Sequence, residues 1–190
     1  MRAPVAAAFA AALLLGAGCG NERGTPPDFD ALGKPGATAE YVSPGVVRFR
    51  YPVTWFAAGA TPPRYAQLSS GGALASVYAY PRTDLGTDPP SVEAARERLI
   101  KSLERRDPGF LVEGSKITEI DGSPAVEIRG RGTIAGEPVK IRSVHVYRPG
   151  VEWLIDAYAR PRQFAEANRT AFEPMLASIK LSENPPPAEG

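Results

Sequence analysis

Four strand-like segments follow one another without an intervening helix, and this run constrains the fold more than any other feature. The segments cover residues 110–120, 125–131, 139–147 and 151–159. They are rich in β-branched and aromatic side chains, which favour strands. Asp121-Gly122 and Pro149-Gly150 favour tight turns, and residues 132–138 are predicted to form a longer loop. The chain is therefore expected to contain an antiparallel meander.

Further strands are predicted before this run. Residues 46–51 alternate apolar and charged side chains before a proline, which indicates a strand that ends there. Residues 65–70 and 73–80 flank Gly71-Gly72, and two glycines supply the positive φ that a hairpin turn needs. These segments are expected to add to the antiparallel sheet.

Two helices are predicted, one before the meander and one after it. Ser91 is a suitable N-cap, and apolar residues then recur at helical spacing until Asp107-Pro108-Gly109. Residues 164–179 carry a second apolar stripe, which Pro174 is expected to break or kink. Strands punctuated by helices, without a βαβ alternation, predict an α+β domain with a mostly antiparallel sheet.

The N-terminal 18 residues have the pattern of a bacterial export signal, with Arg2 followed by the apolar run 5–15. This run is too short to span a bilayer as a helix. The residues Leu15-Gly16-Ala17-Gly18-Cys19 resemble the lipobox of bacterial lipoproteins. That resemblance implies that Cys19 carries a diacylglyceryl group and becomes the new N-terminus, anchored by acyl chains such as palmitate. The alternative is an ordinary secreted protein in which Cys19 is removed or left as a free thiol.

Composition then divides the rest of the chain. Residues 19–40 are rich in Gly, Pro and Thr and are predicted to be a flexible linker, and residues 182–190 a disordered tail. The intervening segment, residues 41–181, is predicted to be one domain. It contains 19 basic and 15 acidic residues, which is a mild basic excess. Export and near-neutral charge argue against a nucleic-acid partner.

One cysteine and one histidine in the whole chain exclude an intramolecular disulfide and a Cys/His zinc cluster. No metal or cofactor is expected. The run from Gly130 to Ala135 has the spacing of a dinucleotide-binding loop. However, Gly136 and Pro138 follow at once, where that loop requires a helix.

His145 is the only imidazole that is available as a general base. It shares one face of its strand with Ser143, and Asp156 is a possible carboxylate partner, so a hydrolase is one alternative function. A pair of carboxylates, Glu127 and Asp156, is another possible basis for hydrolysis. A structural, half-buried histidine is the preferred interpretation.

A charge ladder is predicted on two neighbouring strands of the meander. Glu127, Arg129 and Arg131 alternate on one strand, and Lys140 and Arg142 on its partner. One interpretation is cross-strand ion pairing on a solvated surface. The other is a docking face for an anion or a partner, with Arg129, Arg131, Lys140 and Arg142 as the contact residues.

The segment Phe49-Arg50-Tyr51-Pro52-Val53-Thr54-Trp55 resembles the F-x-Y-P-x-x-W signature that opens PsbP-like domains. Residues 120–125 are similar to that family's I-x-G-x-P-A turn, and residues 164–178 to its closing helix. The resemblance implies an α/β/α sandwich around an antiparallel sheet. It also implies a binding or assembly factor rather than a catalyst, and similar domains occur on actinobacterial lipoproteins of the LpqN type. The matching positions are structural, so no functional residue carries over.

The sequence thus predicts a lipoprotein on the extracytoplasmic face of the cell membrane, which binds a protein or small ligand without catalysis. A small-molecule or lipid carrier is the main alternative, and it requires an apolar pocket between the sheet and the helices.

Overall fold

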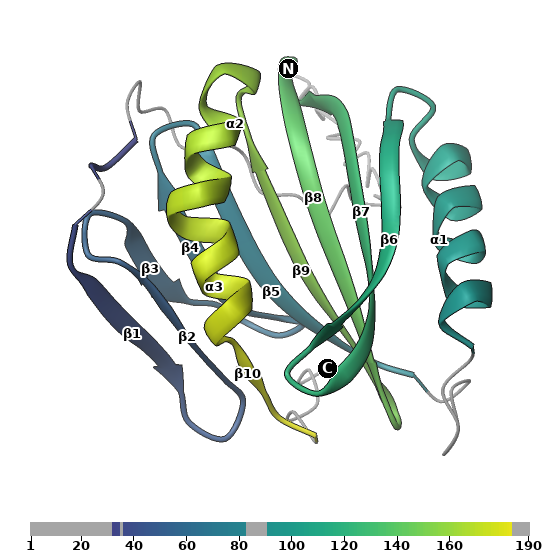
Figure 1. Ribbon diagram of the computed structural model, residues 1–190, viewed down its shortest axis with the longest axis horizontal. Helices are drawn as coiled ribbons and strands as arrows, with labels where there is room; N and C mark the ends of the chain where they lie inside the picture. The colour runs from purple at the N-terminus through teal and green to yellow at the C-terminus, as the bar shows by residue number, and fades with distance from the viewer. Residues whose placement is uncertain (1–31, 35, 83–90, 184–190) are drawn as a thin grey trace, which may run out of the picture.

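The computed structural model describes residues 32–34, 36–82 and 91–183 (Figure 1). The predicted signal sequence, Cys19, and most of the predicted linker and tail lie outside these residues. In the described part of the chain, no helix combines the length and the apolarity that crossing a bilayer requires.

Within these residues, ten strands form two antiparallel sheets. A small sheet has the order β1-β2-β10, and a large sheet has the order β3-β4-β5-β9-β8-β7-β6. The strands are β1 (Thr38–Ser43), β2 (Val47–Pro52), β3 (Phe56–Gly59), β4 (Arg64–Ser70), β5 (Ala73–Pro81), β6 (Leu111–Ile120), β7 (Ser123–Ile134), β8 (Glu137–Arg148), β9 (Val151–Ala159) and β10 (Lys180–Leu181). The predicted meander is present as β6 to β9, and the sheet-dominated α+β class is confirmed.

The connection between β7 and β8 is shorter than expected. In place of a loop over residues 132–138, the two strands continue to a tight turn at Ala135 and Gly136, which have φ values of 51° and 83°. Pro138 lies inside β8, opposite Thr133 of β7. The pairing of β9 with β8 ends at Lys140, so the missing N–H of Pro138 faces no third strand.

The first helix, α1 (Val92–Arg106), begins and ends where the sequence predicts. The Ser91 hydroxyl accepts a hydrogen bond from the amide of Ala94 at 3.2 Å, and Asp107 caps the C-terminal end. Ala95 and Leu103 are buried in one apolar cluster with Ile128 of β7 and other sheet residues. Thus α1 packs on the outer end of the large sheet, against β6 and β7 (Figure 1).

The C-terminal helix continues through its proline. It consists of α2 (Pro161–Ala167), one π-helical turn (Asn168–Phe172) and α3 (Glu173–Ser178). Pro174 has no N–H to donate, and its ring crowds the carbonyl four residues earlier. The wider π turn directly before α3 accommodates this conflict, so the expected break does not occur.

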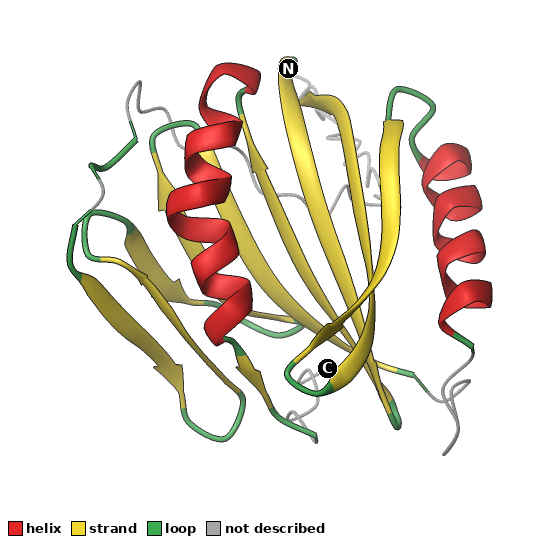
Figure 2. Ribbon diagram, in the orientation of Figure 1, coloured by secondary structure: helices red, strands yellow, loops and turns green. Residues whose placement is uncertain are grey.

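Helix α1 and the C-terminal helix contribute to different apolar clusters. These clusters lie on opposite faces of the large sheet, because successive residues of a strand point to opposite faces. Ala125 and Val144 lie in one cluster with Phe172 and Met175 of the C-terminal helix. Their neighbours in the sequence, such as Val126 of β7, lie in the cluster of α1. Figure 2 shows the C-terminal helix crossing the sheet and α1 standing at its edge.

The first predicted strand is the middle strand of the small sheet. Phe49 and Trp55 of the family-like signature are 1% and 3% exposed, and Pro52 ends β2, as the resemblance implies. The start of β1 at Thr38 lies within the segment predicted to be linker. The amide of Gly33 also donates to the Ser70 hydroxyl at 2.7 Å, so the chain packs against the domain before residue 41.

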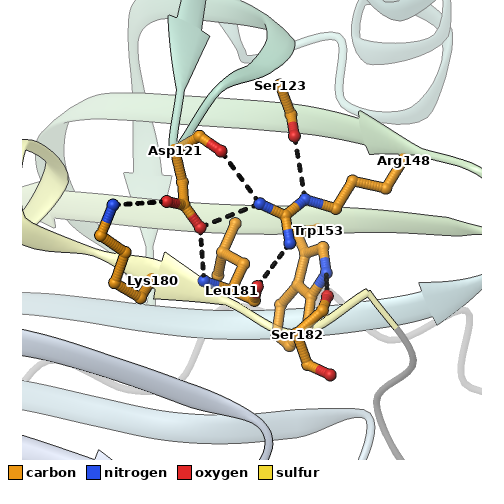
Figure 3. A network of polar contacts seen from close by, with 7 residues as sticks. All are labelled: Asp121, Ser123, Arg148, Trp153, Lys180, Leu181 and Ser182. Atoms are coloured by element: carbon orange, nitrogen blue, oxygen red, sulfur yellow. Dashed lines mark hydrogen bonds and ion pairs between the residues drawn. The ribbon is translucent and has the colours of Figure 1, made fainter.

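A polar network attaches β10 to the β6–β7 turn (Figure 3). The Asp121 carboxylate accepts hydrogen bonds from Lys180 Nζ at 2.7 Å and from the Leu181 amide at 3.0 Å. Arg148 Nη2 lies 2.9 Å from Asp121 Oδ2, and Arg148 Nη1 donates to the Leu181 carbonyl. Trp153 Nε1 donates to the Ser182 carbonyl at 3.2 Å. The C-terminal strand is therefore held to the large sheet by side chains, in addition to its backbone pairing with β2 in the small sheet.

Candidate functional site

The charged side chains of β7 and β8 gather on the face of the sheet that carries the C-terminal helix. Glu127 is paired with Val144 and Arg129 with Arg142, and residues paired across strands point to the same face. Arg131 and Lys140 form the next pair along the same face. The register therefore brings together the ladder that the sequence predicts.

Glu127 is the centre of this cluster and is only 2% exposed. Its carboxylate lies 2.9 Å from Arg142 Nη2, 2.6 Å from Arg129 Nε and 3.5 Å from Lys116 Nζ of β6. Burial raises the pKa of Glu127, but the hydrogen bonds from Arg142 and Arg129 outweigh it and hold the pKa below its ordinary value. Glu127 is thus a buried, ionised carboxylate surrounded by three cations.

Arg142 is internal, which corrects the expectation that it contacts a partner. The residue is 7% exposed, and Nη1 donates to Asn168 Oδ1 of the π turn at 2.7 Å. The same atom lies 3.7 Å from the Glu173 carboxylate. Its charge therefore compensates Glu127 and connects β8 to the C-terminal helix. A buried carboxylate requires a cationic partner. The Arg142 side chain is therefore buried beside Glu127 instead of facing solvent.

The remaining cations of the cluster are available to solvent. Arg129, Arg131 and Lys116 are exposed, and Lys140 is half-buried. A hollow of about 300 Å³ lies beside two of these cations, lined by Gly114, Ser115, Lys116, Glu127 and Arg129. Because Glu127 is already neutralised, the outer rim of this hollow presents positive charge to an approaching acidic group.

Two members of the cluster, Lys116 and Asn168, were not among the residues predicted from the sequence. Lys116 is paired with Glu127, across the β6–β7 hairpin whose Asp121-Gly122 turn the sequence shows. Pairing the residues of the two strands one by one from that turn would have placed Lys116 opposite Glu127. The contact of Asn168 with Arg142 joins residues 26 positions apart across two packed elements, and no local pattern indicates it.

The residues considered for hydrolysis do not form a catalytic relay. Ser143 is buried and donates directly to the Asp156 carboxylate, while His145 Nδ1 lies 2.7 Å from Glu152 Oε1. A serine nucleophile needs the imidazole between itself and the carboxylate. Here each of the two side chains is paired with a carboxylate of β9 instead. Asp156 and Glu127 lie on opposite faces of the sheet, which also separates the proposed carboxylate pair.

The acidic partner of His145 is held ionised. Burial raises the pKa of Glu152, but His145 and Arg82 outweigh it, so the pKa of this carboxyl lies below its ordinary value. Among the described residues, no group of three or more His, Cys, Asp or Glu side chains is placed to hold a metal ion.

A third feature bears on the carrier alternative. A hollow of about 290 Å³ is lined by Val42, Val46, Val47 and Leu181 together with polar residues of the small sheet. It lies beside β10 rather than between the large sheet and the C-terminal helix, where a carrier pocket was expected.

The fold that presents these features is of the PsbP-like class. The solution structure of cyanobacterial PsbP (CyanoP) from Synechocystis sp. PCC 6803 is similar to the chain, with a TM-score of 0.56 and 14% identity. The match covers 86% of this chain and 96% of that chain. The crystal structure of LpqN, described as involved in cell envelope biogenesis of Mycobacterium tuberculosis, has a TM-score of 0.55 and 13% identity. This match covers 77% of this chain and 90% of that chain.

By sequence, no model of a protein family matches the chain, and no curated protein matches it significantly. The structural likeness therefore confirms the predicted PsbP-like fold, and the fold alone.

Proposed function

We propose that this protein is a membrane-anchored, extracytoplasmic lipoprotein that binds or helps to assemble a partner without catalysing a reaction. Cys19 is the proposed lipid attachment site, and Arg129, Arg131, Lys116 and Lys140 form the proposed docking surface. The observation that carries the docking proposal is the buried, neutralised Glu127 beneath exposed cations. Its charge is already compensated, so the outer cations remain to attract an acidic partner.

The residues of this surface divide into two roles. Arg129 and Arg131 lie on β7, which is paired on both sides, and both side chains are exposed. Arg129 Nε contacts Glu127 at 2.6 Å and Arg131 Nε lies 3.9 Å from the exposed Glu113, so an acidic partner would bind the remaining guanidinium nitrogens. Guanidinium groups bind carboxylates through paired hydrogen bonds, which suits recognition of an acidic protein segment. Arg142 and Glu127 position the strands and do not reach the partner.

The similarity in fold to PsbP and to LpqN supports this proposal in a limited way. LpqN is a protein involved in cell envelope biogenesis of Mycobacterium tuberculosis. A role at the cell envelope for the present chain agrees with its export signal and its lipobox-like sequence.

The test is crosslinking in intact cells followed by identification of the proteins that co-purify. We expect R129Q/R131Q to lose the specific partner while the protein stays in the membrane fraction. The matched control is R105Q/R106Q, which removes the same charge from exposed residues at the end of α1. Equal capture by both variants and by the unmodified chain contradicts the docking surface.

The anchor is tested separately with Cys19→Ser. We expect this variant to move from the membrane fraction to the soluble extracytoplasmic fraction. Mass spectrometry of the unmodified chain should find acyl groups on Cys19, and a bare thiol there rejects the anchor.

A further inference from the structure

The outward face of the small sheet carries a row of cations that the docking surface does not include. Along β2, Val47 and Phe49 point inward and are buried, so Arg48 and Arg50 point outward and are exposed. Arg48 is the cross-strand partner of Val42 on β1 and of Lys180 on β10. The three side chains Val42, Arg48 and Lys180 therefore lie side by side across the sheet.

This arrangement is electrostatically unfavourable within the protein itself. Like charges placed directly opposite each other destabilise a sheet, and Arg48 lies opposite Lys180. Lys180 has Asp121 as its partner at 2.7 Å. In the ranges that the structure describes, the side chains of Arg48 and Arg50 form no ion pair, not even with Glu40 opposite Arg50. Two guanidinium groups are thus left to bind anions from outside.

Apolar surface accompanies these charges. Val42 is 53% exposed, and the hollow of about 290 Å³ beside β10 has aliphatic walls with Arg48 and Lys180 at its edge. A row of cations beside the exposed Val42 and a hollow with aliphatic walls matches the chemistry of a lipid surface. There the outermost groups are phosphates and the next are hydrocarbon.

We propose that the outward face of the small sheet, formed by Val42, Arg48, Arg50 and Lys180, docks on an anionic phospholipid bilayer. Arg48 and Arg50 bind lipid phosphates, for which guanidinium groups are well shaped. Val42 contacts the interfacial region beside them. The occupant is a membrane surface because both anionic and aliphatic chemistry are matched within one face.

The position of the face in the chain agrees with this orientation, in a step that rests on the proposed lipid anchor. The small sheet contains β1, the first strand of the described chain. Cys19 precedes Leu32 by 13 residues, which span at most about 45 Å when extended. An acylated Cys19 therefore holds the domain within reach of the bilayer, so that the small sheet is able to contact it, while β7 and its docking surface belong to the other sheet.

The experiment measures binding of residues 20–190, without the acyl anchor, to phospholipid vesicles. The strands and helices of the described residues all lie within residues 38–181, so this chain contains the described fold in full. We expect binding to phosphatidylcholine vesicles that contain phosphatidylglycerol at low ionic strength, weak binding to phosphatidylcholine alone, and loss of binding as salt rises. Each basic side chain near an anionic surface contributes about fivefold, so R48Q/R50Q should weaken binding roughly 25-fold.

The matched variant is R105Q/R106Q, which removes the same charge from exposed residues at the end of α1 and should bind these vesicles like the unmodified chain. Thermal unfolding checks that both variants are folded. If R48Q/R50Q binds as well as the unmodified chain, or if both pairs weaken binding equally, the membrane-facing surface is rejected. Failure of this proposal leaves the docking surface intact, because partner capture in cells depends on Arg129 and Arg131 and is measured separately.

Discussion

Arg148 at the end of β8 and Asp121 in the β6–β7 turn contact each other beside β10, with Arg148 Nη2 2.9 Å from Asp121 Oδ2. The Asp121 carboxylate also accepts a hydrogen bond from the Leu181 amide, and so it holds β10 to the β6–β7 turn. We expect Asp121→Asn to lower the free energy of unfolding by about 2 kcal/mol, because hydrogen bonds to a charged group are lost. Urea denaturation measures this change.

The control for that variant is Lys180→Gln. The Lys180 side chain is exposed, and exposed ion pairs contribute roughly 0 to 1 kcal/mol. A loss in Lys180→Gln as large as that in Asp121→Asn would mean that the ion pair with Lys180, rather than the internal contacts of Asp121, holds β10.

Stability should fall in acid for a specific reason. In the folded protein, burial raises the pKa values of Asp121, Glu127 and Glu152, but hydrogen bonds and nearby cations lower them by more. Carboxyls with lowered folded pKa values stabilise the fold above their ordinary values of 3.8 and 4.5, and this contribution disappears as pH falls through the folded values. The free energy of unfolding should therefore decrease as the pH is lowered from about 6 to about 3. This decrease should be less steep in Asp121→Asn.

Glu127 and Arg142 provide a test of the buried ion pair. Glu127→Gln leaves the guanidinium of Arg142 buried without its closest charge partner, and we expect a loss of about 3 kcal/mol in unfolding free energy. The double variant E127L/R142M removes both charges and should recover most of that loss. If the single variant is as stable as the unmodified chain, the pair does not hold β7 to β8.

Gly130 is expected to be required for packing rather than for phosphate binding. A Cβ at this position would lie 2.6 Å from the Leu111 carbonyl oxygen and 2.6 Å from Phe110 Cζ. Gly130→Ala should therefore lower the unfolding free energy by about 2 kcal/mol, as overpacking does. Gly132→Ala is the matched control, because its nearest contact would be an ordinary 3.6 Å. Equal stability of both variants in thermal unfolding would contradict this role.

The hydrolase alternative has a direct chemical test. Ser143 is buried and donates to Asp156, and His145 is engaged with Glu152, so no activated hydroxyl faces solvent from these residues. We expect a fluorophosphonate probe to leave the folded protein unlabelled. Labelling that Ser143→Ala abolishes would instead establish a reactive serine.

The longer elements were predictable from the sequence because each carries its own periodic signal. The predicted strands over residues 125–131 and 139–147 and the predicted helix after Ser91 all have repeating apolar positions, and all are present. The edge strands carry little signal. For example, β3 has four residues, three of them small, and β10 has two, so only their pairing partners define them.

The candidate site was predictable in part for the same reason. Alternation along β7 shows that Glu127, Arg129 and Arg131 share a face, but it does not show which of them the C-terminal helix covers. Glu127 is buried because Asn168 and Arg142 meet above the sheet, and that contact depends on how α2 and α3 cross it. Exposure is a property of packing between distant elements, which a local pattern does not encode.

The middle strand of the small sheet has one neighbour from the beginning of the fold, β1, and one from its end, β10. The third strand is therefore missing from every nascent chain whose synthesis has not yet passed residues 180–181. Before residues 180–181 are available, the buried apolar side chains of β2 are partly exposed, and the Asp121 carboxylate has no Leu181 amide to bind. The small sheet is thus completed only after residues 180–181 are available, and a chaperone that protects β2 before then would act on a surface that is later buried.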